Sequence, residues 1–334
     1  MTKIGIIGCG FVGSAISEGF KDIAEIYRYD IDPVKKTHEI HEIVNICDFV
    51  FICLPTPMTC AEGGDADLSI IFDFFEKVNN PPLATQEEID DISRQLQNVV
   101  NDPELYFTTT NYFYSEKTKR PNYNIRKDCV FIIKSTVPIG TTKLISEKYN
   151  IENIVHNPEF LTAKNALQDF LHPDRIVIGG EKDFAIEKTM LLYEELFYDH
   201  LKSKSFPVFI MSSDESEMVK YVANAFLATK VSFFNEMRLL SDKKNMNWKN
   251  IVDGVTSDKR IGKSHSIVPD DINERFWSGF CFPKDLNALI KSFEKEEIDP
   301  LLIKATWEVN KKGRKNWDWV GNPSSVSKEK KEKK

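Results

Sequence analysis

Cysteine and histidine are scarce in this 334-residue sequence, and neither occurs in a pattern that marks a metal or redox site. The six cysteines include no C-x-x-C pair, and most lie in apolar segments of a long chain, as is typical of a reducing compartment. The six histidines show no metal-ligand spacing. We therefore expect no disulfide bond and no bound metal.

Long hydrophobic runs and a secretory signal are missing as well. No run approaches the roughly 18 apolar residues that a membrane span needs. The N-terminus leads from Met-Thr-Lys directly into a strand-like segment, without the charged, apolar and cleavage regions of a signal peptide. We therefore expect a cytoplasmic protein without a membrane anchor.

The sequence also has no excess of positive charge. Its formal net charge is -7 at pH 7, and the last seven residues, KEKKEKK, contribute +3 to that value, so the residues before them carry -10. An acidic body repels phosphate backbones and anionic lipid surfaces. Nucleic acid and membranes are therefore not expected as partners.

What the sequence does contain is a regular α/β pattern. Hydrophobic residues make up 41% and charged residues 28%, which is enough apolar material for a folded core. Short apolar runs alternate with helical segments through the first two-thirds, which predicts a Rossmann-type doubly wound parallel sheet over residues 1–211. The predicted strands are residues 3–8, 23–30, 49–54, 129–134, 152–156, 175–179 and 206–211.

The strand pattern stops after Met211. Asp214 and Glu217 resemble a capping box, and apolar residues then recur at helical spacing. This pattern predicts a long connecting helix and then a smaller all-helical domain, together spanning residues 212–320.

Two further segments lack such a pattern. Residues 81–127 are rich in Asn and Tyr and follow a predicted crossover helix at 68–79, so we expect an insert on the sheet edge opposite the ligand crevice. Residues 321–334 have no apolar face, which predicts a disordered charged tail.

A glycine-rich string, GCGFVG, follows the first predicted strand and precedes a helical segment. In a dinucleotide-binding turn such glycines permit the tight bend, the approach of a pyrophosphate and close helix packing. Asp30 ends the second predicted strand, where a carboxylate can bind ribose hydroxyls and repel a 2′-phosphate, which favours NAD over NADP. The alternatives are a glycine turn without a ligand and an ordinary solvated acid. The predicted cofactor-binding residues here are Gly8, Gly10, Phe11, Val12, Gly13 and Asp30.

Two Pro- and Thr-containing strings close the third and fourth predicted strands, LPTP at 54–57 and KSTVP at 134–138. Ligands bind at the carboxyl ends of strands in such sheets, so hydroxyls there can contact a cofactor or a reacting water. Plain turn chemistry is the alternative. The predicted cofactor-binding residues in these strings are Pro55, Thr56, Ser135 and Thr136.

Cys281 is the cysteine predicted to be reactive. Pro283 suits the first position of a helix, so Cys281 would lie at a helix N-terminus beside Lys284, and both the dipole and the cation favour thiolate. The other cysteines are interpreted as buried small hydrophobic residues. Lys220 and Asn224 share one face of the long helix, either as functional groups or as a simple polar stripe.

Seven strings occur in an order that resembles the UDP-glucose/GDP-mannose dehydrogenase family: GCGFVG, LPTP, STVPIGTT, HNPEFL with PDRIVIGG downstream, KYVANAFLATKVSFFNE, SDKRIG and CFPKD. They cover nearly the whole body, leaving out 81–127 and the tail. The resemblance implies a two-step, four-electron oxidation of a nucleotide sugar's C6 alcohol to a carboxylate, with two NAD molecules reduced in turn. UDP-glucose, giving UDP-glucuronate, is the expected substrate.

The resemblance also implies roles for individual residues. Cys281 would attack the intermediate aldehyde to give a thiohemiacetal, whose oxidation yields a thioester that water hydrolyses. Lys220 and Asn224 would stabilise the oxyanion. Asp285, with Thr136 and Glu159, would position and deprotonate the water. The implied substrate-binding residues are Glu159, Phe160, Leu161, Lys220, Asn224 and Arg260.

Arg260 would act from a partner subunit, because the resemblance implies a homodimer built on the long helix after Asp214. Glu159 also has a plain structural reading, as an exposed acid in a capped helix start.

The sequence departs from the family pattern in three places. The family's C-terminal domain, which grips the nucleotide diphosphate, is not expected, because the charged tail stands where it would begin. The stretch RFWSGF at 275–280 replaces a glycine-rich stretch, and its aromatic bulk either blocks the sugar or offers a stacking surface. The acid expected shortly after Glu159 is absent from 162–164, which read TAK.

Two other functions therefore stay open at this point. One is a dehydrogenase of the wider 3-hydroxyacid type, which transfers a single hydride and uses Lys220 and Asn224 without the thiol. The other is a dimeric NAD- or nucleotide-binding protein that is catalytically impaired.

Overall fold

The computed structural model describes residues 1–79, 114–115, 120–121, 125–198 and 206–327. The predicted insert at 81–127 therefore lies almost entirely outside the described residues. Within it, β4 (Tyr114–Ser115) and β5 (Arg120–Pro121) pair antiparallel.

The chain divides into two compact units. The sheet unit comprises Met1–Leu54, Ser69–Ser135 and Gly140–Ser216, and the helical unit comprises Pro55–Leu68, Thr136–Ile139 and Glu217–Lys334. This division differs from the predicted one. The segments after two central strands belong to the helical unit, and the sheet unit extends to Ser216.

A seven-stranded sheet forms the centre of the sheet unit, in the order β2-β1-β3-β6-β7-β8-β9. All seven predicted strands are present within a few residues of their expected bounds. One pair corrects the all-parallel expectation, because β7 and β8 run antiparallel while every other neighbouring pair is parallel. The strands are β1 (Thr2–Ile7), β2 (Ala24–Tyr29), β3 (Phe49–Ile52), β6 (Val130–Ile133), β7 (Ile154–His156), β8 (Ile176–Gly180) and β9 (Val208–Met211).

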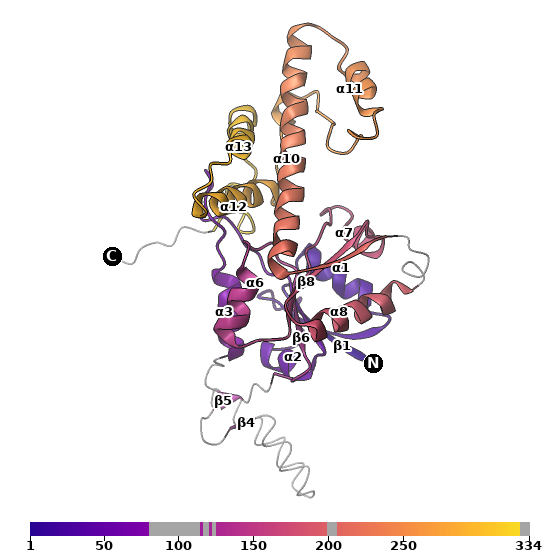
Figure 1. Cartoon of the computed structure of the whole chain (residues 1–334), viewed down its shortest axis with the longest axis vertical. Helices are drawn as coiled ribbons and strands as arrows, with labels where there is room; N and C mark the ends of the chain where they lie inside the picture. Colours follow the sequence, from indigo (N-terminus) through magenta and orange to yellow (C-terminus); the bar gives the residue numbers. More distant parts are fainter. Residues whose placement is uncertain (80–113, 116–119, 122–124, 199–205, 328–334) are drawn as a thin grey trace, which may run out of the picture. The chain divides into compact units, whose positions relative to one another are not determined.

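Helices cover both faces of this sheet, as its continuous apolar strands require (Figure 1). Alternate residues of β3 point to opposite faces, so Phe51 joins the core under α1, α7 and α8. On the other face, Phe75 of α3 packs against Phe131 of β6 and Tyr149 of α6. The covering helices are α1 (Phe11–Phe20), α7 (Ala166–Leu171) and α8 (Asp183–Leu196), and α2 (Ile40–Ile46), α3 (Ser69–Asn79) and α6 (Thr141–Tyr149).

The 31-residue helix α10 (Ser213–Lys243) confirms the predicted long helix. Its capping box is not the predicted one. The Ser212 hydroxyl accepts the Glu215 N–H at 3.3 Å, and the Glu215 carboxylate accepts the Ser212 N–H at 2.8 Å. The cap therefore lies two residues before the predicted pair.

The helical unit continues with α11 (Trp248–Thr256), which folds back beside the C-terminal end of α10 (Figure 1). A short 3-10 helix, η1 (Ile272–Glu274), precedes α12 (Phe282–Lys295) and α13 (Leu301–Gly313). Four tryptophan rings form the centre of its core, with neighbouring centroids 5.2–6.5 Å apart. They belong to Trp277, Trp307, Trp317 and Trp319.

The chain after Gly321 is ordered as far as Ser327, so the prediction of a disordered tail from residue 321 onward is wrong for its first part. Met58 accepts the Ser327 N–H at 2.9 Å and donates to the Ser325 carbonyl at 2.8 Å. The Trp319 indole donates to the Ala61 carbonyl at 3.1 Å. This segment thus pairs with residues 55–68, and the rest of the tail lies outside the described residues.

Candidate functional site

The glycine turn connects β1 to α1. Gly8 has φ +92°, and a Cβ there would lie 2.7 Å from the Cys53 carbonyl oxygen. A Cβ on Gly13 would lie 2.0 Å from the Gly8 oxygen, so helix and turn are in direct backbone contact. Around Gly10, the N-cap of α1, a Cβ would meet nothing within 4 Å, and no side chain caps this helix. The N-terminus of α1 therefore has no side-chain cap and has room beside Gly10, which suits an anion.

Asp30 fixes the shape of this turn. One carboxylate oxygen accepts the Cys9 N–H at 2.6 Å, and the other accepts the Asp32 N–H at 2.9 Å. Asp30 is half-buried, which differs from the alternative of an ordinary solvated acid. Each carboxylate oxygen has a further lone pair, so the carboxylate can still accept a ligand hydroxyl.

The hydroxyls that follow β3 and β6 bond to backbone carbonyls. Ser135 donates to the Leu54 oxygen at 2.6 Å in the sheet unit. Thr56 donates to the Thr136 oxygen at 2.6 Å in the helical unit. These bonds join the two loops. Ser135 and Thr56 therefore have a structural role, which is compatible with the turn chemistry named above as the alternative to cofactor binding.

Lys134 is a residue to which the sequence analysis gave no role. Its side chain is buried, and Nζ donates to Asn157 Oδ1 at 2.9 Å and to the Pro158 carbonyl at 3.3 Å. The available signal was a lysine directly after the apolar run VFII. Lys134 thus holds the start of the loop after β7, in which Glu159 accepts the Leu161 N–H at 2.6 Å.

The far end of that loop is held by charged side chains too. The Arg175 guanidinium stacks on the Phe160 ring at 3.7 Å, and Asp169 accepts both the N–H and the hydroxyl of Thr162 at 2.7 and 2.6 Å. Lys134, the loop and Arg175 line a pocket of about 270 Å³ in the sheet unit. Phe160 and Leu161, predicted to bind substrate, form part of its wall.

In the helical unit, the predicted site residues Asn224 and Asp285 form a hydrogen-bonded network with Lys284. Asn224 on α10 donates to Asp285 at 2.6 Å, and Lys284 pairs with the other Asp285 oxygen at 2.5 Å. Lys220 is buried one helical turn before Asn224. Lys284 was predicted to stabilise a Cys281 thiolate, but its ammonium group forms an ion pair with Asp285.

Cys281 is half-buried and lies at the N-terminus of α12, as predicted; it is the N-cap, and Pro283 is second in the helix rather than first. Burial raises the pKa of Cys53 and of Cys129 to about 12, so these thiols stay protonated near neutral pH. Cys60 is exposed and Cys53 is half-buried, which corrects the interpretation that all the other cysteines are buried.

The aromatic residues before Cys281 are divided between the core and the surface. Phe276 and Trp277 are buried in the core of the helical unit, so they do not offer a stacking surface for a ligand. Phe280 is the partly exposed aromatic of this stretch.

Arg260 lies on an exposed turn after α11. Its guanidinium pairs with Asp258 through Nη2 at 2.6 Å. Lys230 of α10 donates to the Ile261 carbonyl at 2.7 Å and so holds the turn. The predicted site residues thus gather in each unit separately, the glycine turn and the Glu159 loop in one and the Asp285 network in the other.

Within the described residues, no helix has both the length and the apolar character of a membrane span. Those same residues contain no cluster of three or more His, Cys, Asp or Glu side chains that could hold a metal ion.

Comparison with known proteins gives two matches to one family. Residues 107–197 match the NAD binding domain of the UDP-glucose/GDP-mannose dehydrogenase family, and residues 214–312 match its central domain. A UDP-glucose 6-dehydrogenase of Campylobacter jejuni is 39% identical over 216 residues, covering 64% of this chain and 52% of the relative. One from Pseudomonas aeruginosa is 35% identical over 296 residues, covering 85% and 53%. The chain thus spans about half the length of the curated relatives it matches.

Solved structures share the fold. A UDP-glucose dehydrogenase from the archaeon Pyrobaculum islandicum has a TM-score of 0.69 at 24% identity, covering 93% of this chain and 68% of that one. A 3-hydroxyisobutyrate dehydrogenase of Mycobacterium tuberculosis has a TM-score of 0.59 at 14% identity and covers 93% of both chains. At these identities the likeness establishes the fold alone.

Proposed function

Because the chain belongs to the UDP-glucose/GDP-mannose dehydrogenase family, we propose that it oxidises the C6 alcohol of a nucleotide sugar to a carboxylate with NAD. UDP-glucose is the expected substrate, since the curated relatives are UDP-glucose 6-dehydrogenases. The observation that carries the proposal is the buried network of Asn224, Asp285 and Lys284 at the start of the helix that Cys281 caps.

The glycine turn is the proposed cofactor site. The uncapped N-terminus of α1 and the open space at Gly10 suit a pyrophosphate, and Asp30 suits the adenosine ribose. When bound, NAD accepts a hydride in each of the two oxidations. The backbone bonds of Asp30 hold the turn in place before any ligand arrives.

Cys281 is the proposed nucleophile. Its sulfur adds to the carbonyl carbon of the intermediate aldehyde, and the carbonyl oxygen takes up a proton, which gives a thiohemiacetal. Loss of a hydride and of that proton gives a thioester. Water then cleaves the carbon–sulfur bond and releases the carboxylate and the free thiol.

Asn224 and Lys220 are the proposed oxyanion-stabilising residues. The Asn224 amide carries two N–H bonds, and its donation to Asp285 fixes the direction in which the other can donate. The buried Lys220 supplies positive charge from the same helical face. We assign Asp285, Glu159 and Thr136 to the hydrolytic water.

The sugar-binding roles of Phe160, Leu161 and Arg260, and a homodimer built on α10, belong to the same proposal. Exposed apolar side chains recur along α10, which supports a helix face that a second copy covers. They are Met218, Val222, Phe226, Phe233, Met237 and Leu240. Light scattering should give twice the chain mass, and Phe226→Glu should shift it to the monomer.

The direct test is NADH formation with UDP-glucose, GDP-mannose and UDP-N-acetylmannosamine at high enzyme concentration. Two NADH per sugar are expected for the substrate, because the oxidation removes four electrons. Cys281→Ala should stop the second oxidation. No turnover with any nucleotide sugar would contradict the proposal.

A single-step dehydrogenase is the second candidate, since Asn224 is held by Asp285 and Lys220 is buried one turn before it, and neither observation requires the thiol. Such an enzyme would form one NADH per substrate, and Cys281→Ala would keep its rate. The stoichiometry and this variant together separate the two candidates.

A further inference from the structure

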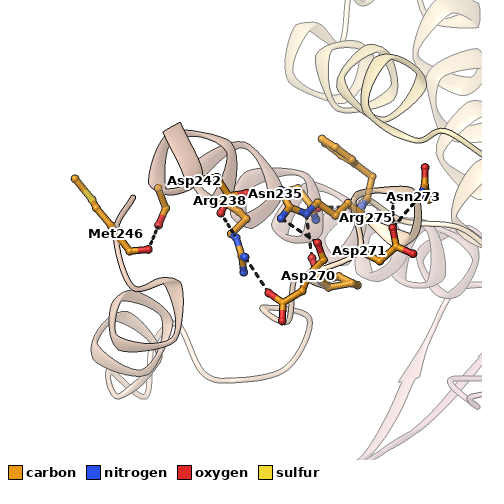
Figure 2. Close-up of polar contacts among 11 residues, drawn as sticks. Asn235, Arg238, Asp242, Met246, Asp270, Asp271, Asn273 and Arg275 are labelled. Atoms are coloured by element: carbon orange, nitrogen blue, oxygen red, sulfur yellow. Dashed lines mark hydrogen bonds and ion pairs between the residues drawn. The ribbon is translucent and has the colours of Figure 1, made fainter. Parts of the chain in front are cut away.

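The segment at 275–280, which precedes Cys281, departs from the family's glycine-rich pattern and is held by a cluster of charged residues. This arginine–aspartate cluster consists of Arg238, Asp242, Asp270 and Arg275, and Figure 2 shows it at the C-terminal end of α10. Asp242 is shared by two arginines, Arg238 at 2.7 Å on one oxygen and Arg275 at 2.7 Å on the other.

Arg275 is the buried member of the cluster, with 4% of its surface exposed. Besides Asp242, its guanidinium donates to the Pro269 carbonyl at 2.9 Å and to the Asp270 carbonyl at 3.4 Å. Within this cluster, Arg238 instead donates to two carboxylates, those of Asp242 and Asp270. The two arginines therefore differ in their place in the chain: Arg275 belongs to the segment that leads to Cys281, whereas Arg238 belongs to α10.

The next residues of that segment are bound through their backbone. Asn235 of α10 accepts the Phe276 N–H at 2.9 Å, and Asn310 accepts the Trp277 N–H at 3.0 Å. Phe276 has φ +65°, a left-handed conformation that a bulky residue adopts only when its surroundings impose it.

The Phe276 ring fits against Gly313, where a Cβ would lie 2.1 Å from a ring carbon. The side chains of Asn235 and Asn310 and the packing of Phe276 thus fix the backbone at 276–277, which glycine residues would leave flexible.

We propose that Arg275, held by Asp242, is a positioning residue that fixes the 275–280 segment and thereby keeps Cys281 half-buried at the first turn of α12. Arg275 touches neither substrate nor cofactor in this proposal. It rests on the proposed function only in naming Cys281 as the nucleophile.

The test compares alkylation of Cys281 by iodoacetamide with that of the exposed Cys60 in the same full-length chain, resolved by peptide mass spectrometry without substrate. Arg275→Met should raise the Cys281 to Cys60 rate ratio about fivefold or more, because the freed segment opens locally. Arg275→Lys should restore part of the wild-type ratio through its remaining bond to Asp242.

Arg238→Met is the matched control, since it removes an arginine from the same aspartate and leaves Arg275 in place. Its ratio should stay at the wild-type value. The buried Cys9, Cys47 and Cys129 report unfolding of the sheet unit, and the fluorescence of the tryptophan core reports unfolding of the helical unit; neither should change in any variant tested.

An unchanged or lower ratio in Arg275→Met would overturn the proposal, and so would an equal rise in Arg238→Met. Modification of the buried cysteines together with Cys281 would show general unfolding and would also count against it. Absence of NADH formation by the wild-type chain would contradict the proposed function and leave the alkylation result standing.

Discussion

The glycine turn of the sheet unit and the segment before Cys281 in the helical unit set a backbone in opposite ways. In the turn, Gly8 and Gly13 allow backbone atoms to approach where a Cβ would collide. Before Cys281, Arg275 and the large aromatic Phe276 hold the chain through their side chains.

The comparison shows two ways to fix a backbone: the absence of Cβ atoms, which permits close backbone contact, and side-chain contacts, which hold a segment in place. At Gly8 and Gly13 the turn tolerates no added atom, whereas the anchored segment tolerates no lost partner. Substitutions that add atoms should therefore damage the first site, and substitutions that remove polar partners should damage the second.

The largest effect is expected for Asp285→Ala in the helical unit. It removes the buried carboxylate that pairs with the mostly buried Lys284 ammonium and accepts from Asn224, which costs about 3–5 kcal/mol of unfolding free energy. Urea unfolding followed by tryptophan fluorescence measures this loss, because the tryptophan core lies in the same unit. Asp73→Ala, which removes the partner of Lys77 in an exposed helical ion pair, is the control and should change little. Equal losses in the two variants would break the comparison.

Gly13→Ala should come next, at about 1–3 kcal/mol, because its Cβ would lie 2.0 Å from the Gly8 oxygen and α1 must shift. NAD affinity, measured by calorimetry, should fall with stability. Gly10→Ala is the matched variant, since its Cβ meets nothing within 4 Å. It should keep the stability and weaken NAD binding by crowding the pyrophosphate. Loss of stability in Gly10→Ala would contradict this separation.

The sequence predicted the parts of the fold that depend on local pattern. Seven apolar runs became the seven strands, and the apolar spacing after Met211 became α10. The direction of β8 against β7 was missed, because an apolar run has the same appearance in either direction. The order of residues 321–327 was missed as well, because it depends on Met58, which is remote in sequence.

The candidate site divides in the same manner. The glycine turn and the place of Cys281 at a helix N-terminus could be predicted, since each follows from residues adjacent in sequence. The buried position of Lys134 and the use of Arg275 as an anchor could not, because burial of a charge depends on partners supplied by other elements.

Lys134→Met sharpens the comparison, because here a charged anchor acts within the sheet unit. The free energy of unfolding should fall by about 1 kcal/mol, since Asn157 Oδ1 still accepts the hydrogen bond from the Tyr193 hydroxyl. The effect should instead appear in the loop at 157–162, as faster hydrogen exchange measured by mass spectrometry. Lys188→Met, which removes a lysine bound to the Asp128 carbonyl elsewhere in this unit, is the control. Unchanged exchange in the loop would show that Lys134 does not hold it.

The smallest effect is expected from the pH dependence of Asp242. Burial acts to raise the pKa of this carboxyl, but the bonds from Arg275 and Arg238 outweigh it and lower the pKa below the ordinary value. A carboxyl with a lowered folded-state pKa contributes stability above its unfolded pKa of about 3.9 and loses it as pH falls through the folded value. The unfolding free energy of wild type should therefore exceed that of Asp242→Asn at pH 7, and the difference should shrink below about pH 4. If the difference instead grew on acidification, the anchoring of the Cys281 segment would not depend on this carboxylate charge.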